Sequence, residues 1–453
     1  MAGALAPLAV FLGGVAWLAR QGAPDERGFW PVLLAALTAG LLLCRDRARY
    51  AETMIAGMAQ PVVMLMILAW LLAGALSSLL SATGFVDALT WSARALDLRG
   101  GLYAGAAFLA CALVSTATGT SFGTLLICGP LLYPAGGGAG AEPAVLLGAI
   151  LGGATFGDSI SPISDTTIAS AGTQAADIGG TVRARLKYVL PAGVLALLAA
   201  VIFGGADTAT PGVLADAAGS ARGLPMLLVP AFVVALLLAR RHLVEALLLG
   251  LLAAVVLAVP LGLLRPGQLL QVEPGSVAAA SVLIDGLERG VGVSVFTLLL
   301  VGLVAVLEAS GALARASARS GLPATVAGTE ARIVAMLTVA VVLTTHSVVA
   351  ILAVGPYVAS LGRQRGISPY RRANLLDVTA CTWPFLLPFF LPTILASSAS
   401  VSGGAAGMPR VSPFAAGMHN AYSWALVLML VVAVVTGYGR REGAGDDYDA
   451  GAK

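Results

Sequence analysis

Long apolar segments alternate with short polar breaks along almost the whole chain. A helix of about 20 apolar residues spans the hydrocarbon core of a bilayer, so the pattern predicts an all-α polytopic membrane protein. The segments over 143–176 and 372–398 each contain a polar interruption and are predicted as broken helices. Shorter amphipathic pieces are expected over 86–98 and 313–322. The predicted spans lie near 3–19, 29–44, 60–83, 100–117, 121–134, 143–176, 186–204, 224–239, 242–264, 291–308, 331–345, 347–361, 372–398 and 420–438.

The composition excludes a soluble globular domain. Of the 453 residues, 58% are hydrophobic and 11% are charged, whereas soluble domains carry about 25% charged residues. The sequence shows no nucleotide-binding glycine motif, no nucleophile–base pair and no cluster of metal-ligating residues. We therefore expect neither an enzyme nor a bound cofactor. We expect transport that is driven by ions rather than by ATP. Nothing in the composition indicates a nucleic-acid partner.

The positions of the basic residues predict which side of the membrane each segment faces. One topology places 18 of the 26 Lys and Arg residues in the cytoplasm and most remaining acidic residues outside, as the positive-inside rule requires. In that topology residues 100–134 start and end outside, and residues 331–361 start and end inside. Each has a polar break at its middle, so each is predicted as a helical hairpin, spanning or re-entrant. The two hairpins open to opposite sides.

Short matches at similar spacing support two inverted-topology repeats. Gly129-Pro130 lies 45 residues beyond Gly84, and Gly355-Pro356 lies 44 residues beyond Gly311. The fold class we predict is two inverted repeats built from broken helices and helical hairpins. Its parts are N-terminal peripheral transmembrane helices (1–53), repeat 1 (54–204), a linker loop (205–223), repeat 2 (224–398), a final transmembrane helix (399–438) and a disordered cytoplasmic tail (439–453).

The most polar run inside the apolar part of the chain is GDSISPISDTT, residues 157–167. Pro162 lies between Asp158 and Asp165 and makes a continuous helix improbable. An unwound stretch frees backbone carbonyls that can bind Na⁺ together with carboxylate and hydroxyl oxygens. The alternative is a polar cytoplasmic loop with helix-capping side chains. The hydroxyl candidates for a sodium site in this run are Ser161, Ser164, Thr166 and Thr167.

The breaks of the two hairpins supply further candidates. Thr118, Thr120 and Ser121 are predicted to aim hydroxyls and helix ends at the ion, unless they only pack helices closely. His346 and Ser347 occupy the corresponding break of the second hairpin. His346 is either a hydrogen-bonded packing residue or a group that senses pH or handles protons.

The last broken segment offers Asp377 as the proton-exchanging carboxylate, with Asn374 on the same helix face. Thr379 and Thr382 follow it as further coupling candidates. The alternative for Asp377 is a salt bridge to Arg371 or Arg372 at the membrane edge. The basic residues 183–187 are expected only to anchor the cytoplasmic interface.

FGDSISPISDTT, residues 156–167, resembles the signature of the NhaC family of sodium/proton antiporters, within the larger ion-transporter superfamily. TGTSFGT, residues 118–124, resembles the first hairpin of that family, and the resemblance spans about residues 54–398. It implies a two-repeat transporter, commonly dimeric, that exchanges Na⁺ for H⁺. The residues it carries over to the site are Asp158, Ser161, Asp165, Thr166 and Thr167.

The second half departs from the better-known antiporters of that family, which resemble one another in an acidic Glu-Asp pair. This chain has RRANLLDVTACTWPFLLPF over 371–389, with Asp377 as its one carboxylate. A branch with this pattern is thought to include carriers of amino acids or other organic solutes.

The sequence leaves two functions open and disfavours a third. The first is a secondary antiporter of the cytoplasmic (inner) membrane that exchanges Na⁺ for H⁺, with the lipid bilayer around it and a homodimer as a common state of its family. The second is a Na⁺- or H⁺-coupled carrier of an amino acid or other small organic substrate. The third, a channel or membrane scaffold, does not explain paired broken helices, because a passive pore needs no alternating access.

Overall fold

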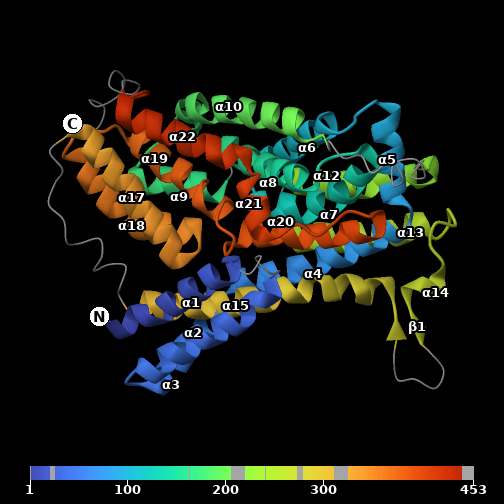
Figure 1. Ribbon diagram of the computed structural model, residues 1–453, viewed down its shortest axis with the longest axis horizontal. Helices are drawn as coiled ribbons and strands as arrows, with labels where there is room; N and C mark the ends of the chain where they lie inside the picture. The colour runs from blue at the N-terminus through green and yellow to red at the C-terminus, as the bar shows by residue number, and fades with distance from the viewer. Residues whose placement is uncertain are drawn as a thin grey trace.

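The computed structural model describes residues 2–20, 26–162, 164–205, 220–239, 241–272, 279–310 and 325–440. Within this part nearly all regular structure is helical, and the long helices run side by side along the long axis of the molecule (Figure 1). The helices are α1 (Ala2–Arg20), α2 (Phe29–Leu43), α3 (Arg47–Met58), α4 (Pro61–Ala82), α5 (Phe85–Ala95), α6 (Gly101–Thr118), α7 (Ser121–Ala139), α8 (Pro143–Ile160), α9 (Asp165–Gln174), α10 (Ile178–Phe203), α12 (Leu228–Leu238), α13 (Leu243–Ala258), α14 (Pro266–Leu269), α15 (Val282–Ala309), α17 (Val326–Thr344), α18 (Ser347–Arg363), α19 (Pro369–Ala380), α20 (Leu391–Ser400), α21 (Pro413–Met418) and α22 (Ala421–Thr436).

Short elements connect these helices. The strands β1 (Gln271–Val272) and β2 (Ala279–Ala280) form a small antiparallel pair next to α14. The 3₁₀ segments are η1 (Glu26–Gly28), η2 (Ala221–Leu227), η3 (Trp383–Phe385) and η4 (Val401–Ala406).

The chain is a multi-pass membrane protein. Five stretches of the described part are long and apolar enough to cross a bilayer, and shorter apolar helices accompany them. The five are Val63–Ala82, Pro143–Gln174, Ile178–Phe203, Val282–Leu307 and Val326–Thr344.

α6 and α7 form a helical hairpin with its break at Gly119 and Thr120. Gly119 has a φ of +70°, a conformation that glycine adopts without strain, and it ends α6. Thr120 then caps α7, because its Oγ1 accepts a hydrogen bond from the Gly123 amide at 3.2 Å. The antiparallel arrangement is shown at the open end, where the Tyr103 hydroxyl donates to the Leu132 carbonyl at 2.8 Å.

α17 and α18 form a second hairpin. α17 ends at Thr344, and α18 begins at Ser347 after the two break residues Thr345 and His346. Far from the break, the Arg332 guanidinium donates to the Tyr357 hydroxyl at 2.5 Å, so the helices run antiparallel. Both hairpins therefore break where the sequence places hydroxyl-rich polar residues.

Two helices are interrupted in the middle of the molecule. α8 ends at Ile160 and α9 starts at Asp165, with Ser161 and Ser164 in extended conformations between them. α19 ends at Ala380, and the chain passes through η3 before α20 begins at Leu391. Proline lies in both interruptions and cannot donate the backbone hydrogen bond that a helix needs.

Small residues let the central helices approach closely. A Cβ on Gly286 of α15 would lie 2.5 Å from Ala75 Cα of α4, and one on Gly74 would lie 2.3 Å from the Gly286 carbonyl oxygen. In the same way, a Cβ on Gly153 of α8 would lie 2.2 Å from the Phe108 carbonyl oxygen of α6. Backbone-to-backbone packing of this kind is typical of membrane helices.

Some expectations differ from the structure or lie beyond it. A separate helix, α3, precedes α4, and α7 continues to Ala139, beyond the expected end at 134. The amphipathic piece expected over 313–322, most of the linker and most of the C-terminal tail lie outside the described residues. The domain boundaries and the inverted relation of the two repeats stay predictions.

Candidate ion-binding site

The breaks of both hairpins and both interrupted helices meet around one cavity of about 200 Å³. Each break brings the end of one helix and the start of the next to the cavity, as expected where irregular backbone is buried inside a membrane protein. The lining residues at the four breaks include Gly119, Thr120, Ser121, Asp158, Ser164, Asp165, Thr166, Thr345, His346, Ser347, Cys381, Pro384, Phe385 and Leu391.

Asp158 is the most enclosed carboxylate on this cavity. It lies in the last turn of α8 with 8% of its surface exposed. The Ser121 hydroxyl, at the start of α7, donates a hydrogen bond to Asp158 Oδ2 at 2.9 Å. Asp158 Oδ1 has no hydrogen-bond partner among the described residues. One oxygen of a buried carboxylate is thus held by the first hairpin.

The start of α9 adds a second carboxylate and two hydroxyls. Ser164 and Thr166 both line the cavity, and their hydroxyl oxygens lie 3.1 Å apart in a hydrogen bond. Asp165 is the first residue of α9, where the partial positive charge of the helix N-terminus favours a carboxylate. Unlike Asp158, its side chain is exposed.

His346, the residue just before α18, also lines this cavity, and its Nδ1 has no hydrogen-bond partner among the described residues. Asp165, His346 and Leu391 also line a second, larger cavity of about 580 Å³. The walls of that cavity are mainly apolar side chains of α15 and α18. Asp165 and His346 therefore line both the smaller cavity at the four breaks and the larger cavity beside α15 and α18.

The remaining predicted residues do not line the smaller cavity. They are Ser161, Thr118, Thr167, Asn374, Asp377, Thr379 and Thr382. Several of these side chains have partners elsewhere: Thr118 donates to the Val114 carbonyl at 2.9 Å, and Thr379 donates to the Leu375 carbonyl at 2.7 Å. Thr382 donates to the Thr379 carbonyl at 2.6 Å. Thr167 and Asp377 both contact Arg185.

Asp377 pairs with Arg185, not with Arg371 or Arg372. Arg185 Nη1 lies 2.6 Å from Asp377 Oδ2, and both side chains are fully buried. The same guanidinium donates through Nε to Asn374 Oδ1 at 3.0 Å and through Nη1 to Thr167 Oγ1 at 2.8 Å. The expectation that residues 183–187 only anchor the interface is therefore wrong for Arg185.

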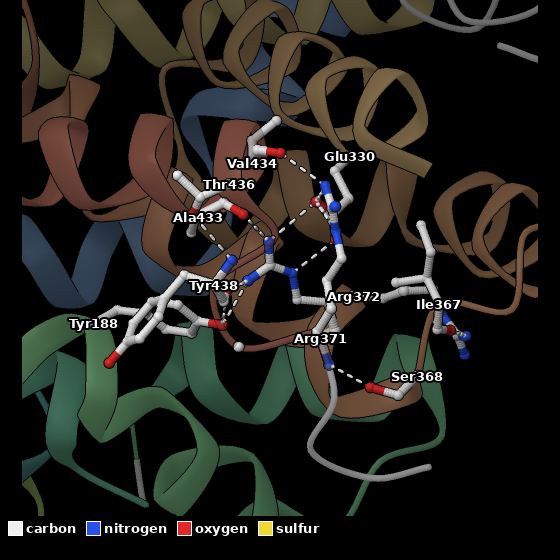
Figure 2. A network of polar contacts seen from close by, with 12 residues as sticks. Tyr188, Glu330, Ile367, Ser368, Arg371, Arg372, Ala433, Val434, Thr436 and Tyr438 are labelled. Carbon is white, nitrogen blue, oxygen red and sulfur yellow. Dashed lines mark hydrogen bonds and ion pairs between the residues drawn. The ribbon is translucent and has the colours of Figure 1, made fainter. Parts of the chain in front are cut away.

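The two arginines proposed as alternatives have other partners. Arg371 forms a two-point ion pair with Glu330, with Nε–Oε1 at 2.9 Å and Nη2–Oε2 at 3.1 Å (Figure 2). Arg372 donates through Nε to Gln174 Oε1 at 3.0 Å. Glu330 also accepts from Arg440 Nη2 at 2.7 Å.

Sequence reasoning missed Arg185 and Glu330, although one signal was present. A carboxylate such as Asp377 inside an apolar segment needs a buried cation or a hydrogen-bonding partner. Arg185 lies at the start of the longest apolar helix of the first half, α10, and so was a candidate for that role.

The comparisons with known proteins point to one family. Residues 27–205 match the sequence profile of the Na⁺/H⁺ antiporter family, a family of transporters and not of enzymes. The chain is 37% identical over 99 residues to the malate-2H⁺/Na⁺-lactate antiporter of Bacillus subtilis and 34% identical over 102 residues to the Na⁺/H⁺ antiporter NhaC of Alkalihalophilus pseudofirmus. It is 35% identical over 92 residues to the arginine/ornithine antiporter ArcD of Halobacterium salinarum.

These matches are short. They cover 22%, 22% and 20% of this chain and 21%, 22% and 19% of the three relatives, in the same order. The chain therefore spans about a fifth of the length of the curated relatives it matches. Their printed names cover both Na⁺/H⁺ exchange and exchange of organic solutes.

Proposed function

From the premise that this chain belongs, through residues 27–205, to the Na⁺/H⁺ antiporter family of secondary transporters, we propose that it exchanges Na⁺ for H⁺ by alternating access. The observation that carries the proposal is the buried carboxylate of Asp158 on a cavity formed by four helix breaks. The cytoplasmic membrane as its location stays an expectation of the sequence analysis. A homodimer stays an expectation from the family resemblance.

Asp158 has the chemistry that coupled exchange requires. Na⁺ prefers oxygen ligands, and the cavity offers carboxylate oxygens of Asp158 and Asp165 with hydroxyls of Thr120, Ser121, Ser164 and Thr166. A proton on Asp158 removes the negative charge that attracts Na⁺, so the two ions exclude each other at this carboxylate. Exchange follows if the occupied carboxylate faces the two sides of the membrane in turn.

The hydrogen bond between Ser121 and Asp158 couples ion binding at Asp158 to movement of the α6–α7 hairpin. Ser121 at the start of α7 holds Asp158 Oδ2, so a ligand that changes this hydrogen bond changes the link between the α6–α7 hairpin and α8. On the other side, Asp165 and His346 join the cavity to the wider one beside α15 and α18. We propose that ions reach the site through this wider cavity in the present conformation.

Replacing the carboxylates tests the function. In proteoliposomes with an internal pH-sensitive dye, a Na⁺ pulse should move protons in the wild type, and Asp158→Asn or Asp165→Asn should abolish that flux. Asp177→Asn is the matched control, because Asp177 caps α10 by accepting from the Gly180 amide at 2.6 Å, a role that Asn also fills. Full Na⁺-triggered proton flux in both site variants would rule out the proposed site.

A second function, coupled transport of a small organic solute, has one supporting observation. The cavities of about 200 and 580 Å³ share Asp165, Thr345, His346, Val348 and Leu391, and together exceed the space that an ion needs. Starts of α7, α18 and α20 reach the smaller cavity, and helix N-termini favour carboxylate groups. Proton flux that requires added malate, lactate or arginine in the same liposomes, with Na⁺ alone inactive, would favour this second function.

A further inference from the structure

Arg185 contacts both ends of the interrupted α8–α9 segment, although it belongs to α10. Its Nη1 donates to the Ser159 carbonyl in the last turn of α8 at 2.8 Å and to the Thr167 hydroxyl in the first turn of α9 at 2.8 Å. Ser159 adjoins Asp158, and Thr167 lies two residues after Asp165. The guanidinium therefore bridges the break next to each of the two cavity carboxylates.

The same side chain reaches the second half of the chain. Arg185 Nε donates to Asn374 Oδ1 at 3.0 Å, and Nη1 lies 2.6 Å from Asp377 Oδ2. Asn374 and Asp377 are three residues apart and share one face of α19. Arg185 thus joins four helices (α8, α9, α10 and α19) at one planar group whose donors have fixed directions.

The surroundings of the two buried carboxylates differ. Asp377 faces a guanidinium at 2.6 Å, and both partners have no exposed surface. Asp158 accepts a hydrogen bond from the Ser121 hydroxyl and lines the cavity. Asp377 does not line the cavity. A buried charge that loses its partner strongly destabilises a fold, whereas removing both charges together is often tolerated.

We propose that Arg185 is a positioning residue for the exchange reaction. It holds the two ends of the α8–α9 break so that Asp158 and Asp165 face one cavity, and Asp377 is its fixed counter-ion instead of the carrier of the exchanged proton. The transport part of this proposal rests on the proposed Na⁺/H⁺ exchange, but the fixed ion pair does not.

Charge complementation tests the ion pair independently of any substrate. Arg185→Gln and Asp377→Asn should each reduce the yield of monodisperse protein in size-exclusion chromatography, and the double variant R185Q/D377N should recover most of it. Arg183→Gln is the matched control, since Arg183 is exposed on the same helix two residues earlier. A double variant no better than the single variants would overturn the ion pair.

Transport kinetics test the positioning. R185K keeps the charge but has a single nitrogen, so it cannot make both the Nε contact to Asn374 and the Nη1 contacts to Ser159 and Thr167. It should fold normally and raise the Na⁺ concentration for half-maximal proton flux by about tenfold. The maximal rate should change far less, and R185Q/D377N should show the same pattern. Unchanged half-saturation in R185K would overturn the positioning role, as would a folded R185Q/D377N with no proton flux at saturating Na⁺.

The experiment separates this inference from the proposed function. If the wild type shows no Na⁺-triggered proton flux, the proposed function fails, while the yields of the four variants still decide the ion pair. In that case thermal stabilisation of the purified protein by Na⁺ replaces flux as the readout for R185K. Equal stabilisation of the wild type and R185K at every Na⁺ concentration would then overturn the positioning role.

Discussion

At the scale of single residues, one hydroxyl joins the first hairpin to the buried carboxylate. Ser121 donates to Asp158 Oδ2 at 2.9 Å, and both groups are almost completely removed from solvent. A hydrogen bond to a charged acceptor contributes about 1.5–3 kcal/mol, more than one between neutral groups. This contact connects what is bound at Asp158 to the position of α7.

Replacing that hydroxyl should weaken Na⁺ dependence without unfolding the protein. In Ser121→Ala the carboxylate loses its donor, and we expect half-maximal proton flux at roughly tenfold higher Na⁺, because the hydroxyl is also a candidate ion ligand. Thr118→Ala is the matched control: its hydroxyl donates to the Val114 carbonyl within α6 and lines neither cavity. Equal Na⁺ dependence in both variants would contradict the role of Ser121.

At the level of residues, polarity alone points to one segment of the chain as the candidate site. Asp158, Asp165 and their neighbouring hydroxyls stand out because polar groups are costly in lipid and need a protected site. The sequence could not assign the partner of Asp377, because Arg185 is 192 positions away and the nearer Arg371 and Arg372 were equally charged. Pairing of buried charges depends on how helices pack, which no local pattern specifies.

At the scale of elements, the breaks were predictable and the packing faces were not. Gly119 stops α6 and Thr120 caps α7, so local chemistry suffices to place that break. The sequence does not specify which face of α9 reaches the cavity. Thr166 lines it while Thr167, the next residue, is turned towards Arg185. The motif therefore predicts the segment but does not separate residues that line the cavity from residues that contact Arg185.

Close helix packing gives a prediction about α4 and α15. In Gly286→Ala the added Cβ would meet Ala75 Cα at 2.5 Å and the Gly74 carbonyl oxygen at 2.6 Å, both backbone atoms that cannot move independently. We expect the free energy of unfolding to fall by about 1–3 kcal/mol, as for overpacked cores. Melting in detergent measures it, with Gly13→Ala as control, because a Cβ there meets no atom within 4 Å. Equal melting temperatures would contradict the packing.

At the scale of the whole molecule, a charged network ties the ends of several helices together. Glu330 of α17 accepts from Arg371 of α19 and from Arg440, which follows α22. Arg371 also donates to the Tyr188 hydroxyl of α10 at 2.5 Å and to the Ala433 carbonyl of α22 at 2.8 Å (Figure 2). The second hairpin is thereby attached through Glu330 to Arg371 and Arg440, and Arg371 extends the network to α10 and α22.

Neutralising this carboxylate should loosen that attachment. Glu330→Gln leaves two guanidinium groups without their anion, and breaking a buried ion pair costs about 3–5 kcal/mol. Glu245→Gln is the control, because Glu245 lies 3.8 Å from Arg241 at an exposed site, where ion pairs contribute about 0–1 kcal/mol. Thermal unfolding should show a large loss for the first variant and almost none for the second. Similar losses of thermal stability in both variants would show that the network stabilises the protein no more than an exposed ion pair does.

The positive-inside rule predicts how the whole chain is arranged in the membrane, and this prediction can be tested directly. In Figure 1, α5 and the α17–α18 pair lie at opposite ends of the long axis. The positive-inside topology places Asp97, just after α5, outside the cell and Arg363, the last residue of α18, in the cytoplasm. The two hairpins then open to opposite sides, which the inverted-repeat prediction requires.

Cysteine labelling decides this topology. In a background with Cys44, Cys111, Cys128 and Cys381 replaced, a membrane-impermeant maleimide should label Asp97→Cys in intact cells and Arg363→Cys only after permeabilisation. Labelling of both variants in permeabilised cells is the control for side-chain access. If intact cells label Arg363→Cys instead, the basic residues lie outside and the orientation is reversed. If both positions react from the same side, the hairpins do not open oppositely, and an inverted pair of repeats is excluded.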